Sequence, residues 1–170
     1  MNSTKILKDE HVNILKVVAG LEEEISELEK GKRIDDEFLR KVIDFVRHYA
    51  DKFHHAKEED IFFKEFNRLA EKGEVHCNPV EQMLHEHEIG REAIKKIEEG
   101  MEKRNRKMVI EGMREYVGMI REHIFKEDEI LYPMADDALS DKAQEKMLKK
   151  FKDVENERDV GKHLEFMRNL

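Results

Sequence analysis

The sequence predicts an all-α protein, an up-down-up-down four-helix bundle with an additional C-terminal helical segment. Its composition is the first observation, because 42% of its 170 residues are charged and only two are proline. This usage is typical of helical proteins. The second observation is that apolar residues recur at helical spacing in four stretches joined by short turns. A chain of this length can bury a core without disulfides or a structural metal.

The first helix is expected to begin at a cap, Ser3 or Thr4, and to end at Gly31. His11 is the only gap in its apolar seam, which consists of Leu7, Ile14, Val18, Leu21, Ile25 and Leu28. The second helix follows a turn over residues 31–36, and its seam consists of Leu39, Ile43, Val46 and Ala50. That seam continues into His54, Glu58 and Ile61. In both helices the polar interruptions are of residue types that can bind metals.

The third helix starts at Asn78, Pro79 and Glu81, which supply a cap, a proline and an early glutamate. Its seam reads Val80, Met83 or Leu84, His87, Gly90, Ile94, Ile97 and Met101. The seam of the fourth helix reads Val109, Met113, Tyr116, Ile120, His123, Glu127 and Ile130. Pro133 is expected to end this helix.

The chain divides into a bundle over residues 1–135 and an extension over residues 136–170. Ser140 is expected to cap a further helix that reaches Phe151 or beyond. No ligand-like residue interrupts its apolar pattern. We therefore expect the extension to pack on the bundle or to form a homodimer interface.

Two stretches, residues 54–63 and 123–132, repeat one pattern. The repeat aligns His54 with His123, Lys57 with Lys126, Glu58 with Glu127, and Ile61 with Ile130. Histidine and glutamate four residues apart share one face of a helix. A second repeat pairs Glu10-His11 with Glu86-His87. The two repeats together predict two helical hairpins related by a pseudo-twofold axis.

In such a bundle, residues early in one helix lie level with residues late in the next. Six residues should therefore converge at one end of the core: His11, His54, Glu58, His87, His123 and Glu127. Unpartnered polar groups are costly in a core, and metal cations would compensate them. Imidazole and carboxylate donors suit two iron ions, and manganese or zinc also fit. Bridging glutamates would leave positions for an oxo or hydroxo bridge and for O2, NO or peroxide.

The chain resembles the hemerythrin-like HHE cation-binding family. The resemblance rests on Glu10-His11, on HHAKEED from residue 54, on EHEIGR from residue 86 and on HIFKEDEILYP from residue 123. It implies a four-helix bundle with a non-haem di-iron centre. It also implies that the six residues above are the metal ligands.

Two positions depart from the oxygen-carrying hemerythrins. Those proteins have a second histidine four residues after the third-helix one, where this chain has Arg91. They also use an aspartate five residues after the last histidine, a position that Asp128 occupies here. The internal repeat favours Glu127 as the ligand, and Asp128 is the alternative. The pseudo-twofold relation suggests His11 with His123 on one metal and His54 with His87 on the other.

The other polar residues have simpler interpretations. An ideal helix turns His55 and His85 away from the neighbouring ligands, so they are expected at the surface or just outside the ligand set. His48, His76 and His163 are expected to face solvent. Tyr116 is expected to be a packed aromatic with a satisfied hydroxyl. Gly90 either permits close helix packing or leaves room for a ligand.

Three function classes fit these observations: a protein that binds or senses O2, NO or iron, an enzyme for peroxide or NO detoxification or iron donation in iron-sulfur repair, and a bundle without metal. The net charge of −8 comes from interspersed charges, which disfavours nucleic acid as a partner. The apolar stretches are too short to span a membrane. With one cysteine, Cys77, the expected location is the reducing cytoplasm.

Overall fold

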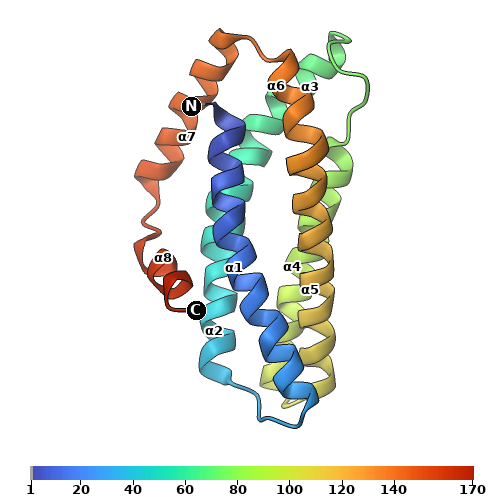
Figure 1. Ribbon diagram of the computed structural model, residues 1–170, viewed down its shortest axis with the longest axis vertical. Coiled ribbons are helices and arrows are strands. Elements are labelled where there is room, and N and C mark those ends of the chain that lie inside the picture. The colour runs from blue at the N-terminus through green and yellow to red at the C-terminus, as the bar shows by residue number, and fades with distance from the viewer. Residues whose placement is uncertain (1) are drawn as a thin grey trace.

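The computed structural model describes residues 2–170, and this range contains helices and turns but no β-strand. Figure 1 shows the long helices running side by side. The α-helices are α1 (Ser3–Glu29), α2 (Asp36–Phe45), α3 (Phe63–Glu71), α4 (Val80–Glu102), α5 (Arg106–Lys126), α6 (Tyr132–Ala138), α7 (Asp141–Glu157) and α8 (Gly161–Arg168). Three π-helical stretches are η1 (Val46–His55), η2 (Glu58–Phe62) and η3 (Glu127–Leu131).

Four rods make the bundle: α1, the run from α2 to α3, α4, and the run from α5 to α6. The predicted all-α bundle with extra C-terminal helices is therefore confirmed. Side chains cap the helix starts, because Asp35 Oδ1 accepts from the backbone N–H of Phe38 and Asn105 Oδ1 from that of Met108. The cap of α1 is Asn2, one residue before the expected range.

The apolar seams predict regular α-helices, but the second and fourth rods contain π-helical stretches. The π-helical stretches η2 and η3 occupy equivalent positions of the repeat, and η1 has no counterpart in the second half. A π-turn inserts an extra residue into a helical turn and so changes which side chains face the core. The register of side chains around the site therefore differs from that of an ideal α-helix.

Pro133 does not end the fourth rod, which continues through α6 to Ala138. The proline lies in the first turn of α6, directly after η3. A missing N–H is tolerated in the first turn of a helix. The prediction of a helix end at Pro133 was therefore wrong.

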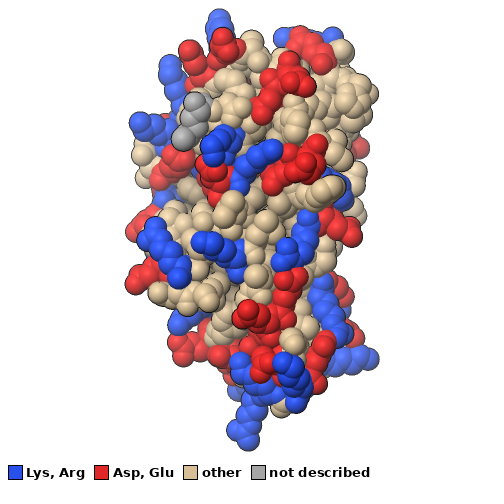
Figure 2. All heavy atoms as spheres, viewed as in Figure 1, with Lys and Arg blue, Asp and Glu red and all other residues tan. Residues whose placement is uncertain are grey.

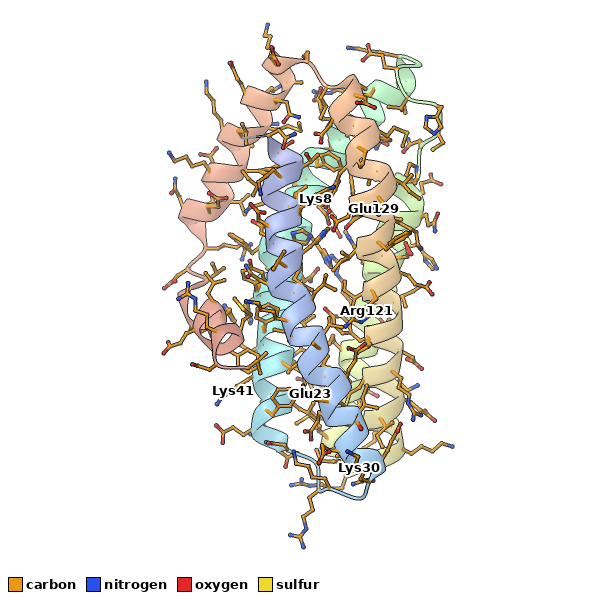
Figure 3. The ribbon with its side chains drawn as sticks, viewed as in Figure 1. Lys8, Glu23, Lys30, Lys41, Arg121 and Glu129 are labelled. Atoms are coloured by element: carbon orange, nitrogen blue, oxygen red, sulfur yellow. The ribbon has the colours of Figure 1, made fainter. Side chains whose placement is uncertain are left out.

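The core consists of two apolar parts separated by a polar layer. One part includes Ile14 and Ile120, and the other includes Leu7 and Leu131. His11 lies between Leu7 and Ile14 on α1. The polar layer is thus built into the seams of the helices, near one end of the bundle. Figure 3 labels Lys8 on α1 and Glu129 on η3, which mark this end.

The C-terminal segment folds back along the bundle, and α7 and α8 lie beside α1 in Figure 1. Ser140 Oγ accepts from the backbone N–H of Ala143, as its predicted capping role requires. Gln144 Oε1 accepts from the backbone N–H and the hydroxyl of Ser3. His163 is buried and pairs with Asp44 at 3.0 Å, so the expectation that it faces solvent was wrong. The homodimer alternative stays a prediction.

The surface carries both signs of charge in close alternation, as Figure 2 shows for one face. Many of these charges form pairs within one helix, such as Lys5 with Asp9 and Lys41 with Glu37. Such exposed pairs add little stability. Within residues 2–170, no helix combines the length and the apolar character that crossing a membrane requires.

Candidate metal centre

The polar layer brings together the six residues that the sequence predicts as ligands. All of them are at most 1% exposed: His11, His54, Glu58, His87, His123 and Glu127. They come from α1, η1, η2, α4, α5 and η3. Two potential metal-binding groups form there, and Glu58 belongs to both. We call them the first cluster (His11, His54, Glu58 and Glu127) and the second cluster (His55, Glu58, His87 and His123).

Glu127 spans the two clusters. Its Oε2 lies 3.2 Å from Nε2 of His11, and its Oε1 lies 3.2 Å from Nε2 of His123. Glu58 spans the two clusters with a single oxygen, since its Oε2 lies 3.7 Å from Nε2 of His54 and 3.3 Å from Nε2 of His87. Each carboxylate can therefore reach two metal positions.

A second set of carboxylates holds the histidines from the other side of the ring. Glu10 Oε2 lies 2.9 Å from Nδ1 of His54, and Glu10 also accepts a hydrogen bond from the buried Nζ of Lys57. In the other half, His123, Glu86 and Lys126 are the counterparts of His54, Glu10 and Lys57. Glu86 lies 3.5 Å from Nδ1 of His123 and also contacts Nζ of Lys126. The repeat therefore extends to the residues that surround the six.

Asp128 belongs to this outer set. Its Oδ1 lies 2.8 Å from Nδ1 of His11, while Glu127 points into the layer. Glu59 occupies the equivalent position of the repeat and lies 2.7 Å from Nδ1 of His87. The geometry thus supports Glu127 over Asp128 as the candidate ligand, and it gives Asp128 the task of orienting His11.

These contacts occupy Nδ1 of His11, His54 and His87. Nδ1 of His123 lies 3.5 Å from Glu86 and makes no hydrogen bond to the described residues. In a neutral ring, a carboxylate beside Nδ1 favours the tautomer with the proton on Nδ1, which leaves the Nε2 lone pair for a metal. Nε2 of His87 and Nε2 of His123 lie only 3.0 Å apart. Among the residues described, the buried Nε2 atoms of His11 and His54 and both oxygens of Glu127 have no hydrogen-bond partner. Crowded, unpartnered acceptors are costly in a core, and divalent cations would satisfy them.

The comparison with known families agrees with this geometry. The family described as Hemerythrin HHE cation binding domain matches residues 2–135. The chain belongs to the hemerythrin HHE cation-binding family. Neither the curated proteins nor the solved structures contain a match. A hemerythrin domain with buried His and Glu clusters is a metal-binding domain.

Without a cation, the hemerythrin site holds protons between its acceptors. Burial alone lowers the pKa of His11, but the neighbouring carboxylates of Asp128 and Glu127 outweigh burial and raise it to about 9. Burial also opposes the charge of His123, yet Glu127 raises that pKa to about 10. Burial lowers the pKa of His54 to about 3. Metal binding therefore has to displace protons from His11 and His123.

The grouping of histidines differs from the suggested one. The structure places His11 with His54 and His87 with His123, whereas the pseudo-twofold relation had suggested His11 with His123. The twofold axis therefore relates the two clusters to each other. Each cluster includes one histidine from an early helix position and one from the following rod, and the second cluster contains His55 in addition.

His55 is the site residue that sequence reasoning missed. It is 6% exposed, and its ring stacks on that of His87 with centroids 3.7 Å apart. His55 belongs to η1, and its ring lies in the second cluster while that of His54 lies in the first. Of the two expected positions, the surface or just outside the ligand set, the surface was wrong, because that expectation assumed ideal α-helical rotation. The HH pair itself was the available signal.

Arg91 does not face the cluster as the missing hemerythrin histidine would. Its guanidinium contacts Asp51 and Glu59, which in turn contact the rings of His55 and His87. Arg91 thus fixes two carboxylates that orient histidines.

A cavity of about 360 Å³ reaches the second cluster, and its lining includes His55, His87, Gly90, Arg91, Tyr116 and Met119. A Cβ on Gly90 would lie 2.6 Å from Cε of Met119, so the glycine combines close packing with a place in the cavity wall. In the described chain the buried hydroxyl of Tyr116 has no hydrogen-bond partner, contrary to expectation.

Proposed function

We propose that the chain holds two iron ions, one in each cluster, and uses them to bind or sense a small ligand such as O2, NO or iron. One observation carries the proposal: the two oxygens of Glu127 face opposite clusters at 3.2 Å from Nε2 of His11 and of His123. A buried carboxylate between two lone pairs is stable when each oxygen binds a cation.

The proposed ligands are four imidazoles and two bridging carboxylates, from His11, His54, Glu58, His87, His123 and Glu127. Iron at such a donor set supplies open coordination positions and redox chemistry, and manganese or zinc also suits these donors. Tyr132 donates a hydrogen bond of 2.5 Å to Oε1 of Glu58 and so fixes the direction of its other oxygen. The outer carboxylates keep each Nε2 turned toward the centre.

The cavity beside the second cluster supports a small ligand. Its volume of about 360 Å³ accommodates diatomic molecules or peroxide, and its lining includes His87 and Tyr116, whose buried hydroxyl has no hydrogen-bond partner among the described residues. That hydroxyl can donate a hydrogen bond to an oxygen-containing ligand. We expect the ligand to reach the centre through this cavity.

Two buried tyrosine hydroxyls near the centre favour a second candidate, an enzyme that consumes peroxide or NO or donates iron for repair. Tyr132 contacts Glu58 directly, and Tyr116 lines the cavity. Either phenol could transfer a proton to a reacting ligand. We expect either function to operate in the cytoplasm.

The test begins with protein reconstituted anaerobically with ferrous iron and analysed for metal. About two iron atoms per chain would support the proposal, and protein without iron would overturn both candidates. The reduced, loaded protein is then exposed to O2, NO or peroxide. A reversible spectral change favours a binding protein, whereas consumption over many cycles establishes turnover and overturns the binding-only function.

A further inference from the structure

The second cluster contains a residue that the proposed centre does not use, His55. Four histidines of the layer share one arrangement, with Nδ1 beside a carboxylate and Nε2 turned inward. His55 shows the same arrangement, because its Nδ1 lies 3.4 Å from Oδ1 of Asp51. Its Nε2 is buried and, within residues 2–170, has no hydrogen-bond partner. A donor atom of His55 lies within 4.8 Å of those of Glu58, His87 and His123.

The outer contacts of His55 are themselves held in place. Arg91 donates to Oδ1 of Asp51 from Nε at 2.9 Å and from Nη2 at 2.6 Å. Asp51 is therefore fixed as an oriented acceptor, which is the usual task of a carboxylate behind a metal-binding histidine. A histidine that only filled space would need neither the charged partner nor the free Nε2.

The two halves of the repeat differ at this position. The counterpart of His55 is Ile124, a buried apolar residue on α5. The first cluster therefore has two histidines, and the second has three within reach. The π-helical stretch η1 is also restricted to the half that contains His55.

We propose that His55 is a fifth histidine ligand and binds the metal of the second cluster through Nε2. The two metals are then inequivalent: one has His11 and His54, the other has His55, His87 and His123, and both share Glu58 and Glu127. This inference rests on the proposed two-metal centre.

The direct test uses wild-type protein loaded with Zn²⁺, which is diamagnetic. Long-range proton-nitrogen correlation spectra report whether each imidazole nitrogen is protonated, free or metal-bound. The proposal expects a metal-bound Nε2 for His55 and for the four other histidines. Two bound Zn²⁺ with a free Nε2 on His55 would overturn it and leave the centre intact. If no Zn²⁺ or iron binds, the centre itself fails, and His55 fails with it.

A variant gives an independent test. In His55→Gly the cavity beside the ring should admit free imidazole. Replacing a metal ligand should weaken metal binding at least as much as replacing the carboxylate that orients it. We therefore expect one of two Co²⁺ ions to bind at least about tenfold more weakly. Added imidazole should restore both the affinity and the visible Co²⁺ spectrum.

The matched control is His85→Gly, which makes the same exchange at an exposed position of α4. It should bind both Co²⁺ ions as wild type does, with no response to imidazole. Unchanged Co²⁺ binding and spectrum in folded His55→Gly would overturn the assignment. Helix content by circular dichroism confirms folding, and the wild-type spectra decide the question if the variant unfolds.

Discussion

Oε2 of Glu10 lies 2.9 Å from Nδ1 of His54, while its other oxygen accepts from the fully buried Nζ of Lys57. The glutamate thus orients a candidate ligand and neutralises a buried cation at once. Its counterpart Glu86 contacts His123 less closely, at 3.5 Å from Nδ1, and pairs with Lys126, which is 29% exposed. The two halves share their chemistry and differ in how much the outer ion pair is shielded from water.

We expect Glu10→Ala to lower the free energy of unfolding by about 3–5 kcal/mol, because it leaves the Lys57 ammonium buried without its main partner. Glu86→Ala should lower the free energy of unfolding by less, since the ammonium of Lys126 can reach water. Both variants should bind metal about 10–100-fold more weakly. Urea denaturation and chelator competition measure the two effects. Equal stability losses in the two variants would contradict the role given to burial.

Glu127→Ala should lose at least one metal per chain while its helix content largely survives. The apolar seams supply most of the stability, whereas the proposed role of the Glu127 carboxylate is to bind the metals. Glu129→Ala is the control, because it removes an exposed carboxylate two residues away on η3. Metal analysis and circular dichroism give the readout. Full metal content in folded Glu127→Ala would remove this glutamate from the ligand set.

Gly90→Leu should slow the binding of NO or azide to the loaded protein without changing its metal content. The new side chain would project toward Met119 and narrow the cavity beside the second cluster. The control is Gly118→Leu on α5, at an exposed glycine where an added Cβ would meet nothing within 4 Å in the described part of the chain. Stopped-flow traces compare the rates. Equal rates in both variants would mean that ligands enter elsewhere.

The docking of α8 should depend on pH through His163. Burial lowers the pKa of His163 in the fold, although Asp44 opposes this shift. The unfolded chain therefore binds more protons as the pH falls below about 6.5, and the stability that neutral His163 contributes is lost on the acidic side. His163→Gln should lose less stability than wild type between about pH 7 and pH 5. Urea midpoints at both values measure this, and identical losses would contradict it.

Much of the fold and the centre could be predicted because the ligands interrupt regular apolar seams. His11 replaces one apolar residue between Leu7 and Ile14, so its inward direction follows from helical periodicity alone. The internal repeat also distinguished His54 from His55 as the counterpart of His123. These inferences need only sequence spacing, which the folded chain preserves on α1, α4 and α5.

Two of the missed features, the position of His55 and the helix past Pro133, share one cause, which is the π-helical stretches. Periodicity assumes a constant rotation per residue, and η1 breaks that assumption at His55. The continuation of the helix past Pro133 follows from η3 in the same way. The burial of His163 was missed for another reason, since it depends on how α8 packs against α2, which no local pattern reveals.

The number of metals per chain tests the proposed two-metal centre most directly. Protein prepared without oxygen, supplied with ferrous iron and freed of excess metal should contain about two iron atoms per chain by elemental analysis. Wild-type protein that retains no iron, manganese or zinc under these conditions would contradict the account.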